Sequence, residues 1–315
     1  MSSLFQKEIP DWDTWGELFQ SITDFAPLIE AIQRKEQLPG GIIENLTPGT
    51  NAVFGCGKLV YKIYAPLFSS SDATREYDTE LFGLRFAQSL GVRSPKVVAA
   101  GELNDRYIFR YFVLERLEGP EAGDSLKWLD SKEKGRFVSE LHRLLQTWNR
   151  PLPENNPLNR AFLAGGGQDW DIFGNNIARE LNDLNRRKFF SEPLCYVHGD
   201  LTAQNVLLDA QNRPLPIDFA DSRYAPPFYE LPPVLFDLFD FDPELIRLFC
   251  ADTAPVELAD RAFFGILLHE FGASIAEIIC KRFLHCEAGE LKSIFFIRNF
   301  LRRYFTECTD VPKKF

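Results

Sequence analysis

The feature that most constrains the fold of this chain is a short β-rich island inside a second half that is otherwise helical in pattern. Its three apolar runs are Cys195-Tyr196-Val197, Val206-Leu207-Leu208 and Leu215-Pro216-Ile217. The loops beside these runs contain the polar sequences HGDLTAQN and IDFAD. Loops that a helical scaffold supports often carry catalytic groups. The island is therefore the first candidate for a functional site.

The segments before the island have a different pattern. Apolar residues spaced by three or four predict an amphipathic helix over 14–36. Short β-rich runs with turn signals between them occupy 41–116, and a helical segment near 72–90 interrupts them. After Gly119-Pro120, helical patterns cover 124–149, 169–190, 233–250, 255–284 and 288–306. These patterns predict an α+β protein in which a small antiparallel sheet with one helix precedes a larger helical part.

Length and charge limit the domain organisation and the class of partner. A chain of 315 residues is long enough for two domains or lobes. The net charge of −10 disfavours general binding to nucleic acid or to an anionic membrane surface, whereas a cationic substrate is compatible with it. The sequence starts without a signal-peptide pattern and contains no uninterrupted apolar run of membrane-spanning length, which predicts a cytoplasmic protein.

Six cysteines are scattered along the chain without a CxxC pair. This spacing suggests neither a zinc ribbon nor a disulfide framework. We interpret them as buried, reduced thiols.

Three oxygen-bearing side chains in the island are suited to one chemical task. Asp200 lies on the first loop, Asn205 follows five residues later, and Asp218 follows the next hairpin. These groups could meet around one Mg²⁺ without long connections. Phosphoryl transfer needs oxygen ligands for the metal and a carboxylate for the incoming hydroxyl. The island therefore predicts a phosphoryl-transfer site.

The same loops resemble those of a known family. HGDLTAQN followed by IDFAD is similar to the catalytic and metal-binding loops of the aminoglycoside phosphotransferase and choline kinase family, a branch of the protein-kinase-like fold. The resemblance implies that Asp200 is the catalytic base and that Asn205 and Asp218 hold Mg²⁺. It also implies that His198 braces the loop and does not react.

The resemblance extends upstream to a nucleotide site. Val60-Tyr61-Lys62-Ile63 is similar to the third strand, whose lysine contacts the α- and β-phosphates, and Glu80 lies where the family has the glutamate that pairs with it. Residues 47–54, including Asn51, occupy the place of the phosphate-covering loop. Residues 112–119 resemble the interlobe hinge, so the backbone at Glu115 and Leu117 would bind adenine.

The resemblance implies a bilobal fold and a small-molecule kinase. Residues 41–116 would form the nucleotide-binding N-lobe, 117–315 the helical C-lobe with the catalytic loop and acceptor pocket, and 1–40 a helical extension packing on the N-lobe. The cofactors would be ATP or GTP with Mg²⁺, and the partner a small molecule with a hydroxyl group. The acceptor could be a cation, such as an aminoglycoside or an amino alcohol, bound by the acidic segment 237–261. A solvated helix face is the alternative interpretation of that segment. The acceptor's identity and the oligomeric state stay open.

Other functions fit the sequence less well. A two-metal phosphatase would draw on several histidines, and of the four here only His198 adjoins the acidic loops. A serine hydrolase lacks support because no GxSxG occurs. Protein-directed kinase activity is an alternative, although the segment after Asp221 contains no APE motif. A regulatory nucleotide-binding module without activity is another, although the lysine, base and metal carboxylate are all present. His142, His269 and His285 lie in helical patterns, which favours structural or surface roles.

Overall fold

The computed structural model describes residues 3–66, 73–152, 156, 158, 170–186 and 192–310. Its contacts divide the chain into two compact units. The first comprises Met1–Glu118 together with Ile217–Asp221, and the second comprises Gly119–Pro216 together with Ser222–Phe315. The predicted division into an N-terminal extension (1–40), an N-lobe (41–116) and a C-lobe (117–315) stays a prediction.

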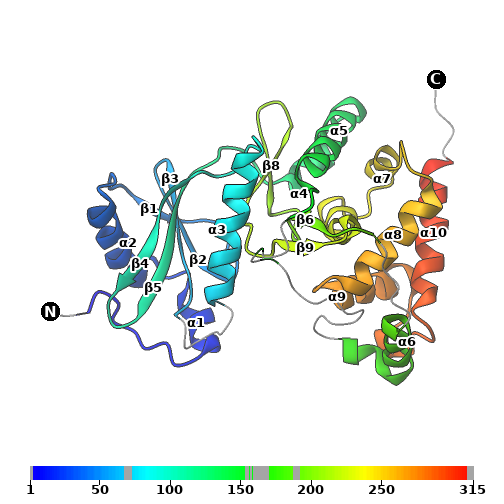
Figure 1. The fold of residues 1–315 in the computed structure, drawn as a ribbon, viewed down its shortest axis with the longest axis horizontal. Coiled ribbons are helices and arrows are strands. Elements are labelled where there is room, and N and C mark those ends of the chain that lie inside the picture. The colour runs from blue at the N-terminus through cyan, green and yellow to red at the C-terminus, as the bar shows by residue number, and fades with distance from the viewer. Residues whose placement is uncertain are drawn as a thin grey trace. The chain divides into compact units, whose positions relative to one another are not determined.

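The first unit is built on a five-stranded antiparallel sheet (Figure 1). Its strands are β1 (Ile43–Asn45), β2 (Ala52–Cys56), β3 (Leu59–Ile63), β4 (Val97–Asn104) and β5 (Ile108–Glu115), in the spatial order β1-β2-β3-β5-β4. The helices of this unit are α1 (Trp12–Leu18), α2 (Ile22–Glu36) and α3 (Ala73–Ser89). The register places Lys62 of β3 opposite Val53 of β2 and Phe112 of β5.

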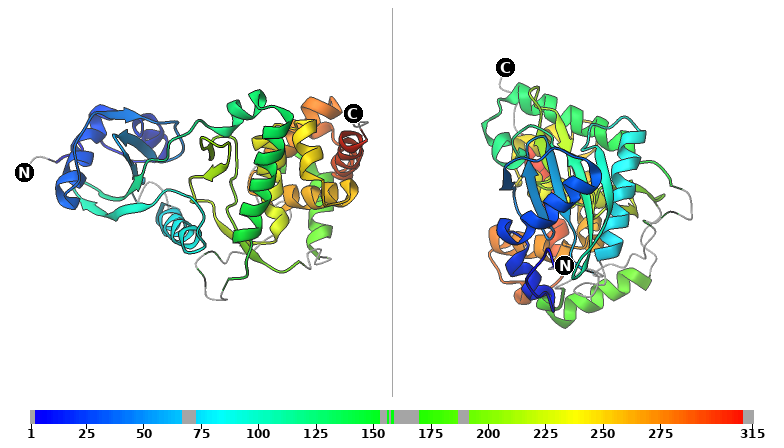
Figure 2. Two further views of the ribbon diagram at one scale, coloured as in Figure 1. Left: turned by 90° about the horizontal axis from the view of Figure 1, so that it is seen from above. Right: turned by 90° about the vertical axis from the view of Figure 1, so that its left-hand side faces the viewer.

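Side-chain alternation assigns the two faces of this sheet to different helices. Tyr61 and Ile63 lie on one face and belong to a buried core with Phe25 and Ile29 of α2. Phe112 lies on the other face and stacks on Tyr77 of α3, with 4.4 Å between ring centroids. Figure 2 shows the sheet with α2 and α3 on either side of it. The α3 face is the one that carries Lys62.

The helix predicted over 14–36 is two helices, because α1 ends at Leu18 and α2 begins at Ile22. Ser21 is the N-cap of α2, and its hydroxyl accepts a hydrogen bond from the Asp24 amide. A side chain that binds the first free amides favours a new helix start at this position. The apolar spacing continues across the break, which is why periodicity alone merges the two helices.

The second unit is mostly helical, as predicted, with four short strands. Its strands are β6 (Cys195–Val197), β7 (Val206–Leu208), β8 (Pro214–Pro216) and β9 (Arg223–Ala225), paired antiparallel as β6-β9 and β7-β8. Its α-helices are α4 (Ala122–Ser125), α5 (Ser131–Trp148), α6 (Gly174–Arg186), α7 (Pro243–Phe249), α8 (Pro255–Leu268), α9 (Gly272–Ile279) and α10 (Phe295–Thr309). Helices α8 and α10 lie side by side (Figure 1). Of the helices in the described ranges, none is both long and apolar enough to span a bilayer.

Two of the helices predicted in this unit are interrupted. The segment 233–250 is a π-helix (Pro233–Leu238) followed by α7, with Asp240 and Phe241 at φ +44° and +59° between them. The segment 255–284 is α8, then α9 with a π-helical end (Cys280–Leu284). Asp242 caps α7, which begins at Pro243, and α9 begins at Gly272, so each break has a local signal that apolar periodicity does not include.

Candidate phosphotransferase site

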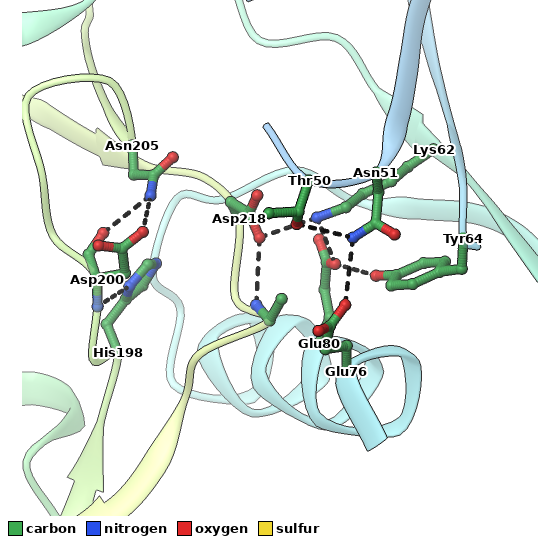
Figure 3. Close-up of polar contacts among 11 residues, drawn as sticks. Thr50, Asn51, Lys62, Tyr64, Glu76, Glu80, His198, Asp200, Asn205 and Asp218 are labelled. Atoms are coloured by element: carbon green, nitrogen blue, oxygen red, sulfur yellow. Dashed lines mark hydrogen bonds and ion pairs between the residues drawn. The ribbon is translucent and has the colours of Figure 1, made fainter. Parts of the chain in front are cut away.

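A buried lysine joins two carboxylates in the first unit. Lys62 is 4% exposed, and its Nζ lies 2.7 Å from Oε2 of Glu80 and 2.9 Å from Oδ1 of Asp218 (Figure 3). These three residues therefore meet in one cluster, although they are far apart in the sequence. Each was predicted from a different motif. Its members come from β3, from α3 and from the IDFAD loop.

Tyr64 completes this cluster and was not identified from the sequence. It lies two residues after Lys62, just beyond the end of β3, and is fully buried. Its hydroxyl donates a hydrogen bond to Oε2 of Glu80, the same oxygen that pairs with Lys62. One carboxylate oxygen thus accepts from an ammonium and a phenol, which fixes the Glu80 rotamer from two directions.

Burial and charge act against each other in this cluster. Burial would lower the pKa of Lys62, but the charges of Asp218 and Glu80 outweigh it and raise that pKa above its ordinary value. Burial raises the pKa of Glu80 to about 7, although Lys62 and the Tyr64 hydroxyl oppose the shift. Lys62 is therefore an ammonium at neutral pH, with its charge compensated inside the cluster.

The Asp218 backbone takes a left-handed conformation, with φ +57°. Its Oδ1 accepts from Lys62 and, at 3.3 Å, from the Ala220 amide. The carboxylate is thereby oriented by its own loop as well as by the lysine. Its side chain is 35% exposed, so it is the most accessible of the three charged groups.

Asn51 immediately precedes β2 and is 2% exposed. Its Nδ2 is 3.4 Å from Oε2 of Glu76 and 3.4 Å from Oγ1 of Thr50 (Figure 3). Within the described residues, its Oδ1 is buried without a hydrogen-bond partner. A buried polar atom of this kind commonly indicates a ligand or water at the site.

The predicted hinge follows the end of β5. The Glu115 amide donates to the Lys96 carbonyl at 2.8 Å, and the Arg116 amide donates to the Lys58 carbonyl at 2.9 Å. Sheet pairing thus uses both amides, and an adenine ring could not bind to them. Leu117 is the next residue, and among the described residues its amide has no backbone acceptor. It is therefore the first amide beyond the sheet that a nucleotide base could use.

The second unit holds the other two predicted site residues together. Nδ2 of Asn205 donates to Oδ2 of Asp200 at 2.5 Å and to the Asp200 carbonyl at 3.1 Å (Figure 3). This pairing orients the Asp200 carboxylate and leaves Oδ1 of Asn205 as the oxygen that can bind a cation. The expected bracing by His198 takes the form of a hydrogen bond from the Asp200 amide to its Nδ1, at 3.3 Å.

Two buried side chains from later in the chain hold the backbone of this loop. Glu230 is 1% exposed and accepts hydrogen bonds from the amides of His198 and Gly199. His269 is 1% exposed, and its Nε2 lies 2.9 Å from the Gly199 carbonyl. The Phe271 amide donates to Nδ1 of His269 at 3.1 Å, so Nε2 carries the ring proton and donates to Gly199. Gly199 has φ +84°, a conformation that favours glycine.

Burial sets the charge states of these two groups. It raises the pKa of Glu230 to about 7, against the effect of the two amides. It lowers the pKa of His269 to about 3, so the imidazole is neutral at physiological pH. Neutrality preserves the tautomer that binds Gly199. The sequence offered no signal for Glu230, and it suggested for His269 only a structural or surface role.

The chain enters the second unit close to the loop at β7. Gly119 has φ +152°, and a Cβ there would lie 2.1 Å from the Leu208 carbonyl oxygen. The Leu208 amide donates to the Pro120 carbonyl at 2.9 Å. Only a residue without a side chain allows this approach, so Gly119 lets the entering loop pack against β7.

Most carboxylates of the acidic segment 237–261 bind protein groups. Asp237 accepts from the Ala203 amide at 2.7 Å, which anchors the loop between Asp200 and Asn205. Four others pair with cations: Asp240 with Arg282, Asp242 and Glu244 with Lys134, and Asp260 with Arg298 and Arg302. Asp252 and Glu257 are exposed. Five of the seven acidic residues in this segment therefore have structural partners.

The fit of these residues to a metal and a nucleotide follows from their chemistry. Asp218 and Asn205 offer hard oxygen atoms, and Mg²⁺ in nucleotide sites commonly uses one or two such protein ligands together with phosphate oxygens. Lys62 offers an ammonium group, and Leu117 offers an amide that has no backbone acceptor among the described residues. The chemistry of these donors fits a nucleotide with Mg²⁺.

Comparisons with known proteins agree with this geometry. Among solved structures, a streptomycin-ATP ternary complex of aminoglycoside phosphotransferase APH(2″)-IIa has 17% identity, a TM-score of 0.55, and coverage of 85% of this chain and 98% of that one. The GDP complex of wild-type aminoglycoside 2′-phosphotransferase-IIIa has 15% identity, a TM-score of 0.58, and coverage of 92% and 99%. At these identities the likeness establishes the protein-kinase-like fold, which confirms the predicted α+β bilobal class.

At the level of sequence, a search of curated proteins found no significant match. The profile of the phosphotransferase enzyme family matches residues 55–264, more than half of the chain. That span includes Lys62, Glu80, the catalytic loop and Asp218, and it confirms the resemblance that these motifs suggested. The chain therefore belongs to the phosphotransferase enzyme family.

Proposed function

We propose that the protein transfers the γ-phosphate of ATP or GTP, with Mg²⁺, to a hydroxyl group of a small molecule. The observation that carries the proposal is the buried ammonium of Lys62, held by Glu80 at 2.7 Å and by Asp218 at 2.9 Å. An inactive relative would be free to lose any of these groups, and this chain retains all of them. The neighbouring structures with bound streptomycin and ATP, or with GDP, support a nucleotide and a small-molecule acceptor.

Each residue has a proposed role in the reaction. Lys62, oriented by Glu80, binds the phosphates, and the backbone near Leu117 and the carbonyl of Glu115 bind the base. Asn51 contacts the phosphates from the loop before β2. Asn205 and Asp218 supply oxygen ligands to Mg²⁺, which when bound neutralises charge that develops on the transferred phosphoryl group.

Asp200 is the proposed base. It accepts the proton of the acceptor hydroxyl and aligns that oxygen for attack, while the hydrogen bonds from Asn205 keep its carboxylate in one rotamer. Asn205 would thus have two functions through two atoms, since Nδ2 orients the base and Oδ1 would be the ligand to Mg²⁺. Glu230 and His269 form hydrogen bonds with the backbone of His198 and Gly199, directly before Asp200.

The acidic segment gives little support to a strongly cationic acceptor. Most of its carboxylates already bind arginine, lysine or backbone amides, so they are not free to recognise amines. We propose that acceptor recognition relies on other groups, and that the negative net charge reflects paired and solvated surface carboxylates.

Asp200→Asn tests the proposal. General-base catalysis contributes about 10²–10⁴-fold, so kcat should fall by that factor, while nucleotide binding measured by calorimetry changes less than about twofold. Asp252→Asn, which neutralises an exposed carboxylate, is the matched control and should retain full activity. Normal turnover of Asp200→Asn would exclude Asp200 as the base.

An acceptor screen separates the alternatives. ADP release would be followed with amino alcohols, sugars, aminoglycosides and hydroxy amino acids. Nucleotide binding without turnover on every acceptor would favour a regulatory module. Labelling of lysate proteins by γ-labelled nucleotide would favour protein-directed activity.

A further inference from the structure

Two cysteines lie on either side of the turn that ends the α9 helix. Cys280 is the first residue of its π-helical end, and Cys286 follows the left-handed residue His285, which has φ +53°. The carbonyl of Cys280 accepts from the amide of His285 and, at 3.1 Å, from the amide of Cys286. The chain therefore turns back so that Cys286 returns to Cys280.

This hydrogen bond brings the two residues within reach of each other. With standard bond lengths, an N···O distance of 3.1 Å limits the Cα–Cα separation to less than about 7 Å. Disulfides span Cα separations of about 4.4–6.8 Å. The backbone thus places Cys280 and Cys286 within disulfide range across the turn.

The segment between the cysteines is held by its own contacts. Arg282 pairs with Asp240 at 2.6 Å and lies over the rings of Phe241 and Phe283. Lys281 pairs with Glu277 at 2.6 Å. These contacts hold the turn that brings the backbones of the two cysteines together, so the chain would need little rearrangement to form the bond.

The two thiols differ in access. Cys280 is fully buried, whereas Cys286 is partly exposed. Burial raises the pKa of Cys280 to about 12, which keeps it protonated and unreactive toward solutes. An oxidant from solution therefore meets Cys286 first, and Cys280 is the buried partner that follows.

We propose that Cys280 and Cys286 form a reversible disulfide when the protein meets a hydroperoxide. The Cys286 sulfur is oxidised to a sulfenic acid, and the hydroperoxide is reduced to the corresponding alcohol or to water. The Cys280 sulfur then attacks the Cys286 sulfur, the S–O bond breaks, and the hydroxyl leaves with the Cys280 proton as water. A dithiol such as dithiothreitol restores both thiols by exchange. This modification site is independent of the phosphotransferase reaction.

The sequence provides a direct assay. Lys281 and Arg282 lie between the cysteines, so trypsin separates Cys280, in peptide 262–281, from Cys286, in peptide 283–292. Full-length protein would be treated with hydrogen peroxide, the remaining thiols blocked, and the digest analysed by mass spectrometry without reduction. We expect the two peptides as one covalently linked species, 2 Da below the sum of their masses, which separates on addition of dithiothreitol.

Matched variants identify the pair. Cys286→Ser changes a partly exposed residue and should abolish the linked species. Cys250→Ser should leave it intact, because Cys250 and Cys308 are both buried and expose no thiol to the oxidant. Dimedone trapping on Cys286 without any linked peptide, or linkage of Cys286 to a cysteine other than Cys280, would overturn the proposal.

Discussion

His269 provides the most direct test of whether buried contacts position the catalytic loop. His269→Ala removes the Nε2–H donor and leaves the Gly199 carbonyl without its partner. An unsatisfied buried carbonyl costs about 1–3 kcal/mol. Loss of the stacking on Tyr229, at 4.5 Å between centroids, adds about 0.5–1.5 kcal/mol. The free energy of unfolding should therefore fall by about 2–4 kcal/mol, as measured by urea denaturation.

The effect on catalysis should be selective. Gly199 precedes Asp200 directly, so a loosened carbonyl lets the base leave its aligned position. If the 1–3 kcal/mol of the lost hydrogen bond is expressed in the transition state, kcat falls by about 5–150-fold. The nucleotide KM should change little, because the Lys62 cluster belongs to the other unit. His269→Gln retains an N–H donor and should recover most of kcat.

His142 is the matched control for this substitution. Its ring stacks on Phe249 at 4.2 Å, and His142→Ala removes an imidazole of the same size from the same unit without touching the loop. It should lower stability and leave kcat near the wild-type value. If His269→Ala folds and retains kcat within about twofold of wild type, the positioning argument is wrong. Equal losses of kcat in His142→Ala and His269→Ala would also contradict it.

Two further changes test other parts of the structure. Tyr64→Phe removes the hydroxyl that donates to Glu80, a hydrogen bond to a charged group worth about 1.5–3 kcal/mol; the nucleotide dissociation constant should rise about tenfold or more by calorimetry, and unchanged affinity would exclude a positioning role for the phenol. Asp260→Asn removes the carboxylate whose pKa is lowered to about 2, despite partial burial, by hydrogen bonds and charge from Arg302 and Arg298. Because the native pKa lies below the ordinary value, this stabilisation is present above about pH 4 and is lost as pH falls toward 2. Solvent screens the partly exposed cluster, so we expect a loss of about 1–2 kcal/mol at pH 7. Urea denaturation should show this difference shrinking below pH 4, and a difference independent of pH would contradict the assignment.

The site residues that the sequence predicted share one property: each lies in a motif with fixed spacing. Lys62 and Glu80 follow the order of strand and helix, and Asp200, Asn205 and Asp218 follow the β-rich island. Residues of this kind can be predicted from short stretches of sequence, because the reacting groups must lie on particular loops. The structure brings Lys62, Glu80 and Asp218 together, and Asp200 and Asn205 together.

The supporting residues could not be predicted in the same way. Tyr64, Glu230 and His269 act through burial and through single hydrogen bonds to distant residues. A histidine in a helical pattern looks the same whether its ring faces solvent or a catalytic loop. Its role arises from the break between α8 and α9, which lies at His269 itself. Gly265 lies near the end of α8 and Gly272 begins α9, so the sequence carries a weak signal for the break, but nothing in it places the His269 ring against Gly199.

Residues with an unusual backbone conformation were also difficult to predict from the sequence. Asp240 and Phe241 both have positive φ, a conformation that aspartate adopts more often than most residues but that is exceptional for phenylalanine. Arg282, 41 and 42 residues away, pairs with one and lies over the ring of the other. By contrast, the break between α1 and α2 had a readable signal, since Ser21 followed by Asp24 is a typical helix start. Local motifs mark some helix boundaries, and tertiary contacts decide the others.

Under the proposed function, the charges of the Lys62 cluster give a reason for the nucleotide to bind together with a metal ion. Among the described residues of the cluster, Lys62 carries the positive charge, and Glu80 and Asp218 together compensate it. The cluster therefore has no surplus positive charge with which to attract a polyphosphate. A nucleotide bound there would gain electrostatic stabilisation only if further positive charge entered with it, and oxygen ligands such as Asp218 are suited to bring a divalent cation. Under the proposed function, the carboxylates that immobilise the lysine would make phosphate binding depend on the metal. The proposed roles of the lysine and of the metal ligands are therefore connected, because the carboxylates that orient Lys62 also neutralise the charge with which it would attract phosphate.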